Sequence, residues 1–146
     1  MAIQNLTRGT TLATHERWAV TVEQRTRGLL DSDGLAPGEA LVISPCNSVH
    51  MFGMAFALDV VFVDRDRRVV RVVPELQPRR FTRIHLRARH TVELPVGVIA
   101  ASGTCPGDQL DLGTIPEAAR GVSSLALAVA ALVAAVGLLI LLQRTL

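Results

Sequence analysis

The sequence predicts a mainly β (α+β) fold: a compact β-sandwich or small barrel with one or two short helices, followed by one C-terminal transmembrane helix. Short runs of valine, isoleucine and leucine are separated by glycine, proline and aspartate, which are turn residues. No long helical period appears in the first 112 residues. An uncharged apolar run from Val122 to Leu142 then follows in this chain of 146 residues.

Individual elements follow from these patterns. We expect strands at residues 18–23, 40–44, 58–63, 69–73, 92–94 and 109–112. Residues 24–30 are expected to form one or two helical turns that stop near Gly28. Asp64 to Arg67 has the composition of a hairpin turn. Charged and apolar side chains alternate over residues 83–89, as on a strand.

The apolar run divides the chain into a β-rich domain (1–112), a linker (113–121), a membrane helix (122–142) and a tail (143–146). At ~1.5 Å per residue, Val122 to Leu142 is about 31 Å long, which matches a hydrocarbon core of ~30 Å. Since the N-terminus lacks a signal-like run and the tail is short, we expect a tail-anchored, single-pass protein of the cell membrane with its domain in the cytoplasm. Ala126, Ala130 and Ala134 form a small-residue stripe that could pack a second copy.

Composition excludes several chemistries. All 15 basic Lys and Arg positions are arginine, so Schiff-base and phosphate-loop lysines are absent. The two cysteines, Cys46 and Cys105, are too few for a disulfide framework. No hydrolase, zinc-protease or dinucleotide motif occurs, so no catalytic residue is assigned and no cofactor is expected.

Several segments occur in an order that is found in a known family. They are Arg27 to Leu30, Pro45-Cys46, Val49 to Met54, Leu58 to Asp64, Val92 to Gly97 and Gly107-Asp108. With this order the sequence resembles, over residues 12–112, the uncharacterised family known as domain of unknown function 192. The resemblance implies a compact β-rich fold and no particular reaction. Arg67 stands where the hairpin of this family usually has glycine.

Cys46, His50, Met51 and Met54 are the densest group of potential metal ligands. Thiolate, imidazole and thioether together suit a soft metal such as Cu(I), although no CxxC or HxxxH spacing supports one. The methionines could instead fill the core, and Cys46 with His50 could be a nucleophile and its base. A disulfide between Cys46 and Cys105 is a further alternative, which would require export.

Two acids stand in apolar runs and need partners if they are buried. Asp59 and Glu93 could each bind a ligand, together with His50. Alternatively, each carboxylate could hold a neighbouring loop through backbone N–H groups. A pocket that contained all three side chains would favour an enzyme.

Arginines far outnumber acids between Arg65 and Arg89. One aromatic residue, Phe81, gives base stacking little support, and this argues against nucleic acid. Beside a membrane anchor, such a surface would contact anionic lipid headgroups, although it could also be an ordinary solvated face. The arginines expected on this surface are Arg79, Arg80, Arg83, Arg87 and Arg89.

From the sequence we therefore expect a membrane-tethered, non-enzymatic binding or accessory domain. The alternatives are a soft-metal or redox protein built on Cys46, His50, Met51 and Met54, and an enzyme whose substrate the sequence does not indicate.

Overall fold

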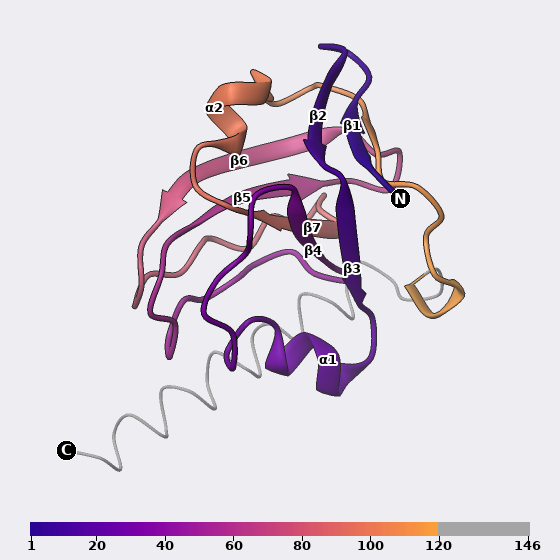
Figure 1. Cartoon of the computed structure of the whole chain (residues 1–146). Coiled ribbons are helices and arrows are strands. Elements are labelled where there is room, and N and C mark those ends of the chain that lie inside the picture. The colour runs from indigo at the N-terminus through magenta and orange to yellow at the C-terminus, as the bar shows by residue number, and fades with distance from the viewer. Residues whose placement is uncertain (120–146) are drawn as a thin grey trace, which may run out of the picture.

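A computed structural model describes residues 1–119 of the chain (Figure 1). The elements in order are β1 (Ile3–Asn5), β2 (Thr10–Ala13), β3 (His15–Ala19), α1 (Val22–Arg27), β4 (Glu39–Ile43), β5 (Leu58–Val63), β6 (Val69–Leu76), β7 (His90–Leu94), α2 (Val98–Ser102), β8 (Leu110–Asp111) and the 3-10 turn η1 (Glu117–Ala119). The prediction of a mainly β fold with short helices is confirmed. Within residues 1–119, no helix is long and apolar enough to cross a membrane. The predicted span from Val122 to Leu142, its alanine stripe and the tail lie outside the described residues.

The strands form two sheets. The larger has five strands in the order β3-β4-β7-β5-β6, and the smaller has three in the order β2-β1-β8. β3 and β4 are parallel, whereas the other neighbours in the larger sheet are antiparallel. Only Thr14 separates β2 from β3, so the chain passes directly from one sheet into the other (Figure 1).

Two hydrophobic cores lie on opposite faces of the larger sheet. The first core joins the two sheets, since Ile3 and Leu110 of the smaller sheet pack with Val61 and Val92 of the larger one. The second core contains Phe62 and other side chains from the opposite face, covered by residues of the connections. Because both faces of β5 are buried, the sequence of this strand is apolar except for Asp59, and its bounds agree with the prediction.

Two predicted strands are wrong. The strand expected at residues 18–23 ends at Ala19, because Thr21 caps α1: its hydroxyl accepts from the Gln24 backbone N–H in a capping box. The alternation at residues 83–89 does not produce a strand. The backbone N–H of His85 instead donates to the Asn47 carbonyl in the irregular β4–β5 connection at 2.9 Å, Ala88 donates to His85 within the segment, and Arg89 donates to Val63 of β5.

The hairpin between β5 and β6 forms as predicted, and a side chain organises it. Asp64 Oδ1 accepts from the backbone N–H groups of Asp66 and Arg68, each at 2.9 Å. Arg67 has a φ of 64°, in the left-handed region that glycine adopts more easily. The positive φ explains why the family that the sequence resembles usually has glycine at this position.

Candidate functional site

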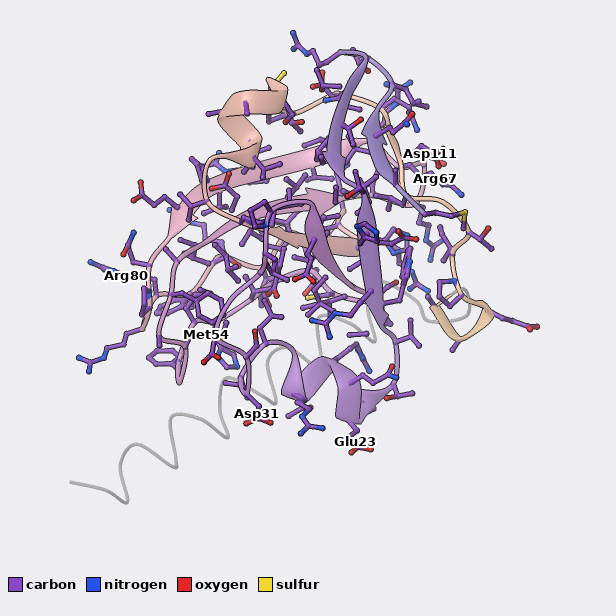
Figure 2. The ribbon with its side chains drawn as sticks, viewed as in Figure 1. Glu23, Asp31, Met54, Arg67, Arg80 and Asp111 are labelled. Atoms are coloured by element: carbon purple, nitrogen blue, oxygen red, sulfur yellow. The ribbon has the colours of Figure 1, made fainter. Side chains whose placement is uncertain are left out.

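Two long connections lie against each other beside the second core. The β4–β5 connection (residues 44–57) and residues 77–88 of the β6–β7 connection, here called the arginine loop, are joined by backbone hydrogen bonds. Met51 donates to the Arg80 carbonyl at 2.7 Å, and Thr82 donates to the Val49 carbonyl at 2.9 Å. Most of the side chains proposed from the sequence as ligands or surface residues therefore lie in one region. Figure 2 shows Met54 and Arg80, one from each connection, at the same end of the domain.

The four proposed metal ligands have different environments. Met51 is 1% exposed and packs in the second core, with Met54 partly buried against it. His50 is exposed, and its ring lies 5.8 Å from that of Phe52. Within residues 1–119 no three His, Cys, Asp or Glu side chains are grouped to hold a metal ion. The structure thus gives Met51 a packing role and offers no support for a soft-metal centre.

Cys46 is a protonated thiol at neutral pH. Burial, with a smaller effect from Glu93, raises the pKa of Cys46 to about 11, and the thiol donates to the Ser48 carbonyl at 3.1 Å. Because the thiolate is the reactive form, this environment argues against a nucleophile. Both cysteines are free, and the Cys105 sulfur lies 2.7 Å from Arg8 Nη2 instead of pairing with Cys46.

Asp59 connects three segments of backbone. Its Oδ1 accepts from the Glu75 N–H at 2.9 Å, and its Oδ2 accepts from Gly97 at 3.1 Å and Ile99 at 2.8 Å. The carboxylate is therefore used by the fold, in the loop-holding role that was one of the two alternatives for this residue. It ties the start of α2 to the edge strand β6.

Glu93 is different, because one oxygen of its carboxyl group is buried without such a partner. The residue is 6% exposed, and Oε2 has no hydrogen-bond partner among the described residues. Burial raises the pKa of Glu93 to about 7. A buried polar group without a partner is costly and calls for an explanation.

Glu93 belongs to a small polar cluster at the base of the β4–β5 connection. Thr91, two residues earlier on the same face of β7, donates to the Cys46 carbonyl at 3.2 Å. Asn47 follows Cys46 and is 1% exposed, yet neither amide atom has a hydrogen-bond partner in the described chain. The polar cluster, defined as Cys46, Asn47, Thr91 and Glu93, includes two residues that the sequence did not single out. His50 is exposed and Asp59 is engaged elsewhere, so the predicted grouping of His50, Asp59 and Glu93 gains no support.

The arginine loop carries cations and exposed apolar side chains together. Its Arg79, Arg80, Arg83 and Arg87 are exposed. Among them lie Phe81, Ile84 and Leu86, which are 72%, 42% and 65% exposed.

The predicted arginine surface needs one correction. Arg89 is only 4% exposed, and its Nη2 donates to the Ala119 carbonyl at 2.6 Å. It therefore belongs to the interior and holds the end of the described chain. The alternation in the sequence suggested that Arg83, Arg87 and Arg89 share one face of a strand, but residues 83–89 form no strand.

Sequence patterns missed two further polar groupings. His90 Nδ1 lies 2.7 Å from Ser44 Oγ in the interior, and no local motif marks this contact. Asp108, interpreted from the sequence as a turn residue, accepts from Asn5 Nδ2 at 2.9 Å and from Arg8 Nε at 3.1 Å. These partners are so distant in sequence that only the β1–β8 pairing brings them together.

Comparisons with known proteins show a similar fold and a shared family. The family model DUF192, described as "Uncharacterized ACR", matches residues 4–112. A UPF0127 protein of Thermococcus sibiricus is 32% identical over 114 residues, covering 73% of this chain and 71% of that protein. A Novosphingobium aromaticivorans protein of unknown function has a TM-score of 0.60 at 24% identity, covering 66% of this chain and 73% of the other. A Sinorhizobium meliloti protein described as a putative transcription regulator has a TM-score of 0.62 at 21% identity, covering 75% and 89%.

Proposed function

We propose that this chain, which belongs to the DUF192 family of uncharacterised proteins, is a membrane-associated binding or accessory domain. In this proposal it has no catalytic role. The arginine loop lies on anionic lipid, and the apolar segment from Val122 to Leu142 crosses the bilayer. Anionic lipid is concentrated in the cytoplasmic leaflet, so the domain faces the cytoplasm.

The observation that carries the proposal is the mixture of side chains on the arginine loop. Arginine side chains near an anionic membrane surface contribute about 1 kcal/mol each. Phe81, Ile84 and Leu86 add apolar surface that would otherwise remain in water. The same arginines could contact nucleic-acid phosphates, but the exposed apolar side chains favour lipid.

The end of the described chain lies beside the residue that follows the arginine loop. The contact between Arg89 and Ala119 places the C-terminal end of the described residues beside the end of the arginine loop. From Ala119 to Val122 the chain can extend at most about 10 Å. The predicted linker of residues 113–121 therefore has a shorter free reach than its length suggests. An anchor that begins at Val122 would hold the C-terminal end of the arginine loop, next to Arg89, close to the lipid headgroups.

Fluorescence quenching by brominated lipid tests the proposal. The full chain is reconstituted in vesicles as Phe81→Trp, with Leu6→Trp as the matched control. Leu6 is also exposed, at 57%, but it lies at the β1–β2 turn. Figure 1 shows this turn at the top of the view, whereas the chain after β6 runs to the lower left. The native Trp18 supplies the same background signal in both variants.

We expect bromine to quench tryptophan at position 81 and to spare tryptophan at position 6. The quenching should increase with the fraction of anionic lipid, and Arg80→Gln with Arg83→Gln should reduce it. Equal quenching at the two positions, or equal quenching in neutral and anionic vesicles, would contradict the proposed orientation.

A further inference from the structure

A carboxyl group with one unpartnered buried oxygen lies on the central strand of the larger sheet. Glu93 of β7 is placed between Leu41 of β4 and Val60 of β5, which face the second core. Cross-strand neighbours share a face of the sheet, so the Glu93 side chain points into this apolar region. Its buried Oε2 meets no hydrogen-bond donor among residues 1–119.

The neighbouring polar groups lie at the edge of this apolar region. Thr91, on the same face of β7 as Glu93, donates to the Cys46 carbonyl at 3.2 Å, and the Glu93 carboxyl contributes to the raised pKa of the Cys46 thiol by electrostatic repulsion. Cys46 is partly exposed as a residue although its thiol is desolvated, so the polar cluster lies close to the surface at this residue. The buried amide of Asn47 adds an oxygen and a nitrogen that have no hydrogen-bond partner in the described part of the chain.

We propose that the polar cluster of Cys46, Asn47, Thr91 and Glu93 binds a primary ammonium group carried on a short apolar chain. A carboxylate, an amide oxygen and a sulfur are acceptors, and an ammonium group supplies three N–H donors and no acceptor. The apolar side chains of the second core that surround Glu93 suit the hydrocarbon part of such a molecule. A metal ion fits less well, because no third His, Cys, Asp or Glu joins Cys46 and Glu93 in residues 1–119. This site is independent of the proposed lipid contact.

Titration calorimetry of the purified full chain with n-butylammonium chloride tests this site. Tetramethylammonium has the same charge without N–H donors, and n-butanol has the same chain without the charge. Glu93→Gln keeps the shape of the side chain and removes its charge. Glu75→Gln is the matched control, because Glu75 is an exposed acid on the edge strand β6.

We expect saturable binding of n-butylammonium to the wild type and to Glu75→Gln, with binding to Glu93→Gln weakened roughly 30-fold or more. Tetramethylammonium and n-butanol should bind the wild type no better than they bind Glu93→Gln. Equal affinity of the wild type and Glu93→Gln, equal binding of tetramethylammonium, or no saturable binding to the wild type would overturn the proposal.

Glu93→Gln should fold, because it replaces a buried ionisable group by a neutral one. If it does not, Cys46→Ala provides the comparison, and unchanged affinity there would also count against the site. A variant that loses amine binding should still show quenching of tryptophan at position 81. A failure of the amine site would therefore not count against the lipid contact, and the reverse also holds.

Discussion

Replacing Asp59 by alanine should destabilise the domain by about 2–5 kcal/mol. The substitution leaves three backbone N–H groups without their acceptor, those of Glu75, Gly97 and Ile99. The bond from Ile99 is buried, so leaving this N–H without an acceptor should cost about 1–3 kcal/mol of stability. Glu75 and Gly97 are exposed, and water can replace part of their bonds, which leaves about 0.5–1 kcal/mol for each.

Urea unfolding of the purified chain, followed by the fluorescence of Trp18, measures this loss as a difference in unfolding free energy. Asp66→Ala is the matched control, because Asp66 is an exposed aspartate in the neighbouring hairpin. The control should change stability by no more than about 0.5 kcal/mol. A loss for Asp59→Ala within that same range would refute the idea that this carboxylate holds α2 to β6.

Three further predictions concern buried groups. Burial raises the pKa of Glu93 to about 7 from 4.5, so its protonated form favours folding, and about 3 kcal/mol of stability should be lost as pH rises across that range. Burial, assisted by nearby arginines, lowers the pKa of His90 from 6.5 to about 4, so the stability that its neutral form contributes is lost as pH falls through that window. In Glu93→Gln the side chain at position 93 no longer titrates, so its free energy of unfolding should show only the loss at low pH that His90 causes. Asp108→Ala should lower the free energy of unfolding by about 2–4 kcal/mol in urea, because a buried donor of Asn5 and a partly buried N–H of Cys105 lose their acceptor; no loss would show that water replaces the carboxylate. Met51→Ala should cost about 2–5 kcal/mol in the same assay and Met54→Ala clearly less, because only Met51 is fully buried; equal losses would contradict the packing role of Met51.

Local patterns predicted the elements whose structure depends on their own residues. The apolar run of β5 gave the correct bounds because this strand is buried on both faces. The hairpin after β5 followed from its charged turn residues, of which Asp64 binds the backbone directly. The short helix α1 was expected two to three residues from its observed position.

Patterns failed where a strand needs a partner. Residues 83–89 alternate like a strand, but backbone N–H groups of this segment bond to three different places: His85 to the β4–β5 connection, Ala88 to His85 itself and Arg89 to β5. The smaller sheet was mostly missed, since β1 and β2 are short and β1 pairs with β8 from the other end of the domain. Alternation describes which side chains could share a face, and hydrogen bonding between distant segments decides whether a sheet forms.

For the candidate site, the sequence alone identified the types of residue, and the tertiary structure assigned their roles. An acid within an apolar run was recognisable at both Asp59 and Glu93. Only the fold distinguishes them, because three backbone N–H groups reach Asp59, whereas Oε2 of Glu93 meets none in residues 1–119. Similarly, composition showed the excess of arginine, but burial of Arg89 depends on the Ala119 carbonyl, 30 residues away in sequence. Residue type limits what a side chain can do, and the partners that folding brings from distant segments determine what it does.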